Sequence, residues 1–292
     1  MQFFIQLAAG GLMVGAIYAL VGMGYSLIYR ASGLLTFAQG EYFMLGAFGI
    51  YTFFVLFDLP YPIAVIAVLL TMVGVGFASE KLLIGPLLRR GAGPIHIVIA
   101  TIGLSIFLLN AAMMVWGSQG FHVPSTLGDM PIRIADVYLV PQNMAIVVIM
   151  FALMIVLHIF MNKSRLGTTL RAAAQDKMAA AALGINVSLA VGLTWGIAVG
   201  LAGAAGLLIA PIYGVSAHMG LLVGLKGFAA AVIGGYGSIY GAVVGGLLVG
   251  LVETFTSGYI DSTMKDVIVF AFLLAVLFFK PTGLLANDML ED

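Results

Sequence analysis

Long apolar runs, broken by short polar connections, make up most of the chain. Windows near the length of a membrane-crossing helix, about 20 residues for about 30 Å of hydrocarbon, lie at 5–29, 35–57, 61–80, 95–116, 142–161, 187–210, 240–257 and 264–280. A ninth run, 221–237, is short, rich in glycine and interrupted by Lys226. The pattern predicts an all-α polytopic membrane protein, a bundle of eight or nine transmembrane helices that forms one domain over residues 1–292.

Composition strengthens this prediction. Hydrophobic residues are 62% of the chain, charged residues only 8%, and the mean hydropathy is +1.16. Soluble domains carry about 25% charged residues, so lipid must cover part of this surface. The zero net charge gives no indication of a nucleic-acid partner. The first apolar run is too long for a signal-peptide core, and no basic residue precedes it, so it is expected to remain as a span.

The basic residues give a predicted orientation. If the N-terminus lies outside and all nine runs cross, nine basic residues fall inside, whereas Arg133 and Lys265 fall outside and Lys226 lies within the membrane. Positive charge concentrates in cytoplasmic loops, so the 117–140 loop is expected outside, and the 162–186 loop and the C-terminus inside. In the alternative with eight crossings, 221–237 is re-entrant and Lys280 lies outside. The nine inside residues are Arg30, Lys81, Arg89, Arg90, Lys163, Arg165, Arg171, Lys177 and Lys280.

Glycines recur four residues apart in several runs. This spacing lets helix backbones approach closely in lipid, where packing replaces the hydrophobic drive. We expect tight packing within one bundle, and a dimer face is the minority interpretation. The pairs and triplets are Gly11/Gly15, Gly196/Gly200, Gly220/Gly224, Gly237/Gly241/Gly245 and Gly246/Gly250.

The 162–186 loop is amphipathic and rich in alanine. A single helix is expected from Thr168, a plausible N-cap, to Leu183, with Gly184 ending it. An alanine face anchors poorly to lipid headgroups but suits a groove in a partner protein. The loop therefore predicts a cytoplasmic helix that couples the membrane domain to another chain.

Three charges lie in or at the edge of apolar runs: Glu41, Lys226 and Glu253. A charge in mid-bilayer costs about 3 kcal/mol or more, so such residues usually face a cavity or a partner. They could line a polar path. Alternatively, Glu41 is interfacial, and Lys226 and Glu253 form a structural pair or snorkel outward.

Catalytic patterns find no support in the sequence. The four histidines are scattered, cysteine is absent, and no carboxylates stand at metal-ligand spacing. Neither G-x-S-x-G nor G-x-x-x-x-G-K-[ST] occurs. We expect a non-catalytic subunit without a metal or cofactor of its own, so any nucleotide energy must come from another chain.

Four separated stretches carry a family resemblance. Residues 33–47 (GLLTFAQGEYFMLGA) and 225–238 (LKGFAAAVIGGYGS) resemble signatures of permease subunits of branched-chain amino acid ABC importers. The loop stretch from Arg171 to Ile185 and the closing 279–285 (FKPTGLL) are similar as well. Gln39, where the family often has histidine, and Arg30 are departures.

The resemblance implies an inner-membrane complex of two permease subunits (the same or sister chains), two cytoplasmic ATPases that bind ATP and Mg²⁺, and an external substrate-binding protein. The implied cargo is branched-chain or other hydrophobic amino acids, and the implied location is the bacterial plasma membrane. A urea or short-amide permease is an alternative, and an ion-coupled carrier using Lys226 and Glu253 is a more remote one.

Two sets of site residues follow from the motifs and the buried charges. The translocation path is expected to include Thr36, Gln39, Gly40, Glu41, Lys226 and Glu253. Coupling to the ATPase is expected from Arg171, Asp176, Ala181 and Gly184.

Overall fold

The computed structural model describes residues 2–125, 132–134 and 137–285. Two short π-helical segments, η1 (Tyr51–Leu56) and η2 (Glu80–Ile84), continue α2 and α3. A hairpin pairs β1 (Ile132–Ile134) with β2 (Val137–Leu139). The α-helices are α1 (Gln2–Ser32), α2 (Gln39–Ile50), α3 (Tyr61–Ser79), α4 (Gly85–Arg89), α5 (Pro94–Trp116), α6 (Pro141–Lys163), α7 (Arg165–Gln175), α8 (Lys177–Ala182), α9 (Val187–Tyr213), α10 (Met219–Gly234), α11 (Ile239–Tyr259) and α12 (Lys265–Phe279).

Each of the nine predicted runs contains a helix, which confirms the all-α membrane bundle. Six helical stretches are long and apolar enough to cross a membrane: Gln2–Ser32, Tyr61–Arg89, Pro94–Trp116, Pro141–Lys163, Val187–Tyr213 and Ile239–Tyr259. Proline at the first position of α5 and α6 suits a helix start, because its missing N–H has no partner there anyway. The second run differs from its prediction, since helix α2 begins at Gln39 rather than near residue 35.

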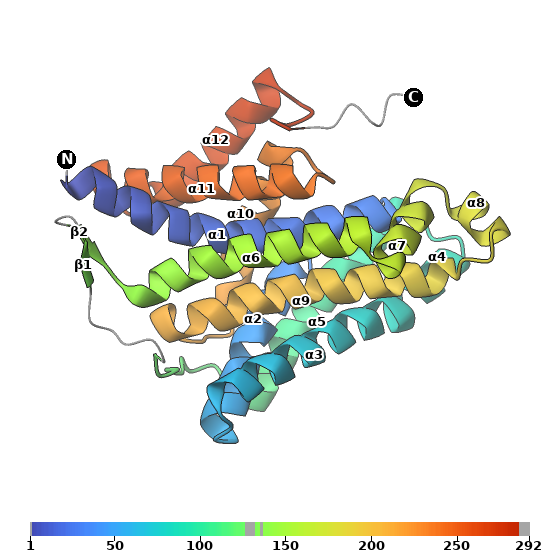
Figure 1. Ribbon diagram of the computed structural model, residues 1–292, viewed down its shortest axis with the longest axis horizontal. Coiled ribbons are helices and arrows are strands. Elements are labelled where there is room, and N and C mark those ends of the chain that lie inside the picture. The colour runs from blue at the N-terminus through green and yellow to red at the C-terminus, as the bar shows by residue number, and fades with distance from the viewer. Residues whose placement is uncertain (1, 126–131, 135–136, 286–292) are drawn as a thin grey trace.

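The segment between α9 and α11, which contains α10, connects the two ends of the bundle. Tyr213, which ends α9, lines a pocket with Gly10 of α1, so α9 ends beside the N-terminal part of α1. Helix α11 begins beside the C-terminal part of α1, where a Cβ added at Gly22 would lie 3.5 Å from the Cβ of Ala242. The stretch from Tyr213 to Ile239, which contains α10, therefore joins opposite ends of the bundle (Figure 1). Helix α10 itself lies beside the C-terminal half of α1, because Gly224 lies near Tyr25 and Gly227 packs against Val21.

The glycine spacing serves packing inside the chain. Helices α1 and α11 run antiparallel, and a Cβ added at Gly15 would lie 2.8 Å from the backbone of Gly246 and Leu247. A Cβ at Gly196 would lie 2.9 Å from the carbonyl oxygen of Val73 on α3. These faces are occupied by the chain's own helices, as the packing interpretation expects.

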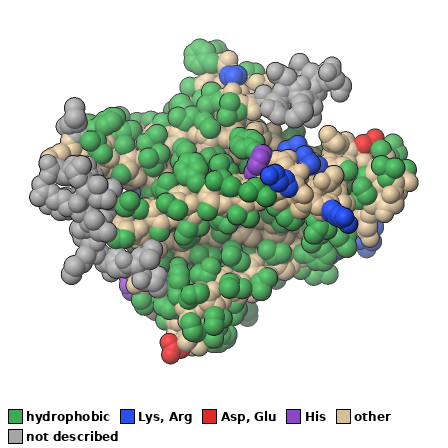
Figure 2. All heavy atoms as spheres, viewed as in Figure 1, with side chains coloured by type: hydrophobic (Ala, Val, Ile, Leu, Met, Phe, Trp, Pro, Cys, Tyr) green, Lys and Arg blue, Asp and Glu red, His purple; other side chains and the backbone are tan. Residues whose placement is uncertain are grey.

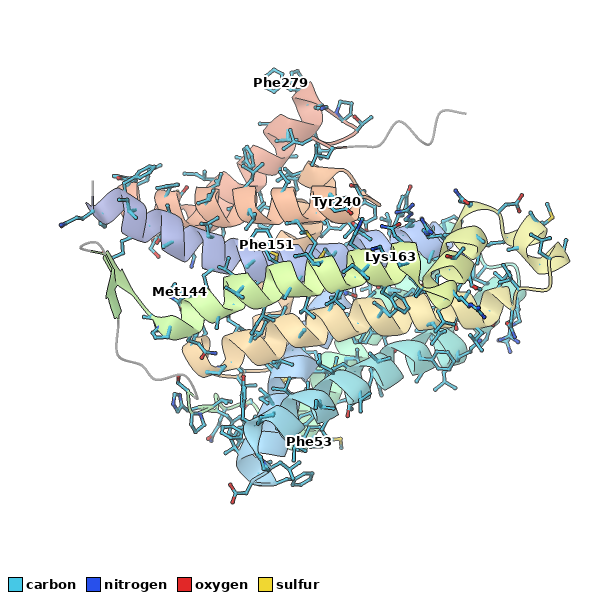
Figure 3. All side chains as sticks on the ribbon, in the orientation of Figure 1. Phe53, Met144, Phe151, Lys163, Tyr240 and Phe279 are labelled. Atoms are coloured by element: carbon cyan, nitrogen blue, oxygen red, sulfur yellow. The ribbon has the colours of Figure 1, made fainter. Side chains whose placement is uncertain are left out.

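Apolar side chains cover much of the face of the bundle seen in Figure 2. Met144 and Phe151 on α6, and Phe279 at the far end of α12, are exposed (Figure 3). Basic side chains gather instead at the end that carries α4, α7 and α8 (Figure 2). The hairpin of the 117–140 loop lies at the opposite end (Figure 1). The surface thus has an apolar belt between two unlike ends.

Candidate functional site

The chain is non-helical between α1 and α2, and this segment, residues 33–38, is held by hydroxyl groups. The backbone N–H of Leu34 donates to Ser32 Oγ at 3.3 Å, and that of Ala38 donates to Thr36 Oγ1 at 3.3 Å. Phe37 N–H donates to Thr101 Oγ1 on α5 at 3.2 Å. Irregular backbone at membrane depth is tolerated where protein groups satisfy it. Thr36, expected in the path, therefore supports the backbone.

Helix α2 begins inside the bundle. Gln39 is fully buried, and its Nε2 donates to the carbonyl of Ala198, near the middle of α9, at 2.9 Å. Glu41 is 3% exposed, and Ser105 Oγ donates to its Oε1 at 2.9 Å. The interpretation of Glu41 as interfacial is therefore not supported. Gln39 Oε1 and Glu41 Oε2 have no hydrogen-bond partner among the described residues.

The start of α2 meets the start of α10, and we name this contact the α2/α10 crossing: Gly40, Glu41, Gly220 and Gly224. A Cβ at Gly40 would overlap the carbonyl oxygen of Gly220 and lie 3.0 Å from Gly224 Cα. A Cβ at Gly220 would lie 2.7 Å from Glu41 Oε2. The Glu41 carboxylate thus sits beside two helix N-termini, whose partial positive charge stabilises an anion.

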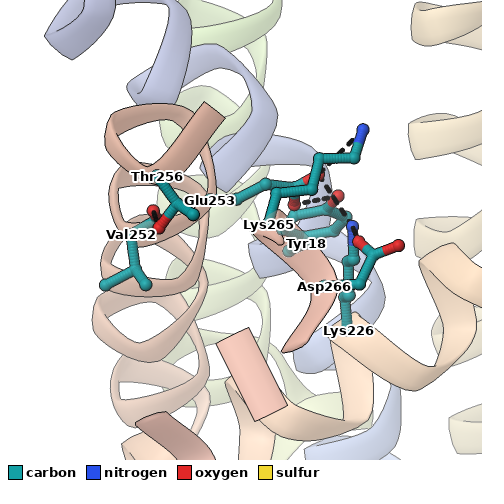
Figure 4. A network of polar contacts seen from close by, with 7 residues as sticks. All are labelled: Tyr18, Lys226, Val252, Glu253, Thr256, Lys265 and Asp266. Carbon is teal, nitrogen blue, oxygen red and sulfur yellow. Dashed lines mark hydrogen bonds and ion pairs between the residues drawn. The ribbon is translucent and has the colours of Figure 1, made fainter. Parts of the chain in front are cut away.

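A second polar group, the charge cluster, joins α1, α10, α11 and α12 (Figure 4). Lys226 Nζ lies 2.7 Å from Glu253 Oε1 and 2.6 Å from Asp266 Oδ1. Tyr18 OH donates to Glu253 Oε2 at 2.7 Å. Lys265 Nζ lies further off, 3.8 Å from Glu253 Oε1. The cluster is defined by these five residues, and its formal charges cancel.

Burial makes the pairing in the cluster essential. The side chain of Lys226 is 4% exposed and that of Glu253 10%, whereas Asp266 and Lys265 are 36% and 38% exposed. A buried charge is tolerated when it is paired and hydrogen-bonded. The alternative that Lys226 and Glu253 form a pair is therefore what the geometry shows.

The six expected path residues fall into two groups. Thr36, Gln39, Gly40 and Glu41 lie around the start of α2, and Lys226 and Glu253 lie in the charge cluster. Helix α10 belongs to both groups, because Lys226 follows Gly224 by two residues. The sequence interpretation missed Tyr18 and Asp266, and it placed Lys265 only as an external charge. The sole sequence signal was that Lys265 and Asp266 begin an apolar run.

The coupling loop, residues 162–186, holds two helices rather than one. The prediction of Thr168 as N-cap is wrong, because α7 begins at Arg165 and Ser164 Oγ accepts from Gly167 N–H at 2.8 Å. The prediction of one helix to Leu183 is also wrong. Asp176 leaves helical geometry, and its Oδ1 accepts from the N–H groups of Met178 and Ala179, which starts α8.

The expected coupling residues take different places in this loop. Gly184 adopts φ +81° after α8, as the prediction of a terminating glycine requires. Arg171 donates from Nη1 to Asn162 Oδ1 at 3.0 Å, and Ala181 is exposed. Lys177, which the sequence interpretation did not select, donates from Nζ to the carbonyl of Ser32, the last residue of α1, at 3.2 Å.

Comparisons with known proteins cover almost the whole chain. Residues 7–277 match the family described as "Branched-chain amino acid transport system / permease component". The high-affinity branched-chain amino acid transport system permease protein BraD of Pseudomonas aeruginosa is 36% identical, over 99% of this chain and 97% of the relative. The corresponding protein LivH of Escherichia coli K12 is 33% identical over the same shares. The probable branched-chain amino acid transport permease protein LivH of Methanocaldococcus jannaschii is 27% identical, over 96% and 91%.

No solved structure matches this chain. The family match spans every helix that builds the α2/α10 crossing and nearly all of α12. This chain belongs to the branched-chain amino acid transport system permease family.

Proposed function

We propose that this chain is the membrane permease subunit of an ATP-driven importer that carries branched-chain or other hydrophobic amino acids. The observation that carries the proposal is the start of α2 inside the bundle. Broken helices whose N-termini meet at membrane depth are typical of solute sites in transporters. Here two such ends meet at Gly40 and Gly220, beside the unpartnered oxygens of Gln39 and Glu41.

Unpartnered buried oxygens favour a cargo with a hydrogen-bond donor. Leaving a buried acceptor unpaired costs about 1–3 kcal/mol. An ammonium group, present in every free amino acid, could donate to Glu41 Oε2 or to Gln39 Oε1 as it passes. The α2/α10 crossing is thus proposed as part of the path, with Thr36 supporting it and the charge cluster holding α10.

The coupling loop is the proposed contact with an ATPase. Met178 on α8 and Leu183, which follows the end of α8, are 84% and 81% exposed, and alanines lie between them in the chain. Such a face fits a groove in another protein. Arg171, Asp176, Ala181 and Gly184 all belong to this loop.

A direct link joins the loop to the path. Lys177 on α8 bonds the end of α1 at Ser32, and residues 33–38 follow at once and lead to Gln39. A displacement of α8 would therefore reach the start of α2 through a short stretch of chain.

The proposed complex lies in the bacterial plasma membrane. It holds two permease subunits, two cytoplasmic ATPases that bind ATP and Mg²⁺, and an external binding protein that delivers the cargo. The coupling loop and the C-terminus face the cytoplasm, and the N-terminus and the 117–140 loop face outward. The gathering of basic side chains beside α7 and α8 supports this orientation.

Reconstitution of the complex in liposomes tests the proposal. We expect uptake of labelled leucine, isoleucine or valine that needs ATP and the binding protein and is unaffected when ion gradients are collapsed. Uptake of urea without uptake of amino acids would favour the alternative cargo. Uptake that persists without ATP and stops with a collapsed proton gradient would favour the ion-coupled carrier.

A further inference from the structure

A pocket of about 300 Å³ opens at the end of the bundle that carries the N-terminus of α1. Several helices end or begin around it: α6 begins near Asn143, α9 ends at Tyr213, and α12 begins at Lys265. In the proposed orientation this is the outer end, where cargo would arrive. The lining residues are Gly10, Met13, Val14, Asn143, Tyr213, Glu253, Thr254, Ser257 and Lys265.

The pocket brings both signs of charge to one wall. Glu253 enters it from the charge cluster, and Lys265 comes from the first turn of α12. The turn before α12 is ordered by Asp261, whose Oδ1 accepts from Thr263 N–H at 2.6 Å. This hydrogen bond lowers the pKa of the Asp261 carboxyl.

The Lys265–Glu253 pair is the loosest contact of the cluster. Lys226 lies within 2.7 Å of both Glu253 and Asp266, so one lysine is shared by two carboxylates. One negative charge is left for Lys265, which meets it only at 3.8 Å and is 38% exposed. A zwitterionic ligand, which carries one positive and one negative group, could enter between Glu253 and Lys265 and leave the total charge at zero.

We propose that this outer pocket binds the backbone of a free α-amino acid, with Glu253 taking the ammonium group and Lys265 the carboxylate. The inference rests on the proposed function and names the groups that would select its cargo. The amide of Asn143 and the hydroxyl of Ser257 supply further donors. Met13 and Val14 form the apolar wall for a branched side chain, since binding pockets combine apolar surface with a few polar groups. Urea, which carries no net charges, has nothing to exchange for the ion pair.

The test uses the complete complex in nanodiscs without its binding protein, titrated calorimetrically with L-leucine. We expect Lys265→Gln to weaken leucine binding by about tenfold, the effect of losing one charged hydrogen bond. Lys265→Arg keeps the charge and should bind within about threefold of the wild type. Lys163→Gln, at the opposite end of the molecule, is the matched control and should bind normally.

Two leucine analogues separate recognition from a structural effect. Isoamylamine lacks the carboxylate, so Lys265→Gln should not change its affinity, whereas Glu253→Gln should abolish its binding. 4-Methylpentanoate lacks the ammonium group, so Glu253→Gln should not change its affinity, whereas Lys265→Gln should abolish its binding. Leucine affinity unchanged in both variants, equal losses for both analogues in each variant, or no leucine binding by the wild-type complex would overturn the proposal.

The inference and the proposed function fail separately. If the wild-type complex imports leucine but Lys265→Gln binds and imports it normally, the pocket assignment is wrong and the importer proposal stands. If the wild-type complex imports no amino acid at all, the importer proposal itself is wrong.

Discussion

The two polar regions that meet on α10 are built in opposite ways. At the α2/α10 crossing, Gly40 contacts Gly220 and Gly224 through backbone atoms, and nearby acceptors stay unpartnered among the described residues. In the charge cluster, Lys226 is held by ions on α11 and α12. Separating the crossing costs mainly van der Waals contact, whereas separating the cluster would expose buried charge. From this comparison we expect α10 to be held more firmly on the cluster side than at its contact with α2.

The two regions also differ in their links to the coupling loop. Lys177 joins α8 to the end of α1, and the chain then runs directly into the α2/α10 crossing. Lys226, by contrast, pairs with carboxylates on α11 and α12, neither of which belongs to the coupling loop. The cluster touches α1 at Tyr18, well before Ser32 in the chain. We therefore propose that a movement of α8 reaches the α2/α10 crossing more directly than it reaches the charge cluster.

Removal of the shared lysine should have the largest effect. Lys226→Met leaves the carboxylates of Glu253 and Asp266 without their close cation, and breaking one side of a buried pair costs about 3–5 kcal/mol. Thermal unfolding in detergent, followed by the fluorescence of Trp116 and Trp195, measures the loss of stability. Lys163→Met, on the exposed end of α6, is the control.

The Lys226→Met variant also tests whether the charge cluster differs from the α2/α10 crossing in holding α10. If Lys226→Met is as stable as Lys163→Met and still transports, the charge cluster does not hold α10. Partial recovery of stability in Lys226→Met/Glu253→Gln would instead confirm that the cost comes from the unpaired carboxylate.

A methyl group at the α2/α10 crossing should have the next largest effect. The Cβ of Gly40→Ala would overlap the carbonyl oxygen of Gly220, and overpacking of this kind costs about 1–3 kcal/mol. Because the added methyl group keeps the two helices from closing again, we expect uptake to fall by at least about tenfold, the rate equivalent of 1.4 kcal/mol.

Gly103→Ala is the matched control for Gly40→Ala. It adds the same methyl group to α5, where no described atom lies within 4 Å of the new Cβ. Helix propensity predicts a gain of up to about 1 kcal/mol there. If Gly40→Ala and Gly103→Ala are equally stable and take up solute equally well, close contact at the α2/α10 crossing is not required for transport.

The parts that the sequence predicts are those with a local cause. Lipid requires an apolar run for each crossing, so the runs were visible, and the glycine spacing of Gly11 and Gly15 marked a close helix contact. Gly184 was predicted correctly because a helix end needs its conformation. The break at Asp176 was missed, since an alanine-rich segment favours helix on both sides and only a side-chain cap interrupts it.

The candidate site was only partly predictable, because it depends on distant segments. The residues around Gln39 do not indicate that its side chain donates to the carbonyl of Ala198, 159 positions away in the chain. The sequence around Tyr18 likewise gives no indication that its hydroxyl donates to Glu253, 235 positions away. Buried charge identified Lys226 and Glu253, but their charged partners Lys265 and Asp266 lie at the start of an apolar run and resemble ordinary boundary residues.

The link from α8 to α1 should give a smaller, more specific effect. Lys177→Met removes the hydrogen bond to the Ser32 carbonyl, about 1.5 kcal/mol for a charged donor. The complex should assemble and hydrolyse ATP, but fewer solute molecules should enter for each ATP consumed. Simultaneous measurement of uptake and phosphate release gives this ratio. Lys177→Arg should keep it, and an unchanged ratio in Lys177→Met would show that the movement travels another way.

The cap of α8 should give the smallest effect, because only one short helix depends on it. Asp176→Ala removes the acceptor for Met178 and Ala179 N–H, which costs about 1 kcal/mol, and it loosens the helix that positions Lys177. We expect faster hydrogen exchange in α8 and weaker co-purification of the ATPase. Asp176→Asn keeps the cap but loses the charge, so it separates two roles. If Asp176→Asn co-purifies with the ATPase as the wild type does, Asp176 acts by shaping α8. If Asp176→Asn co-purifies as weakly as Asp176→Ala, the carboxylate itself meets the ATPase, and Arg171→Ala should then show a comparable loss.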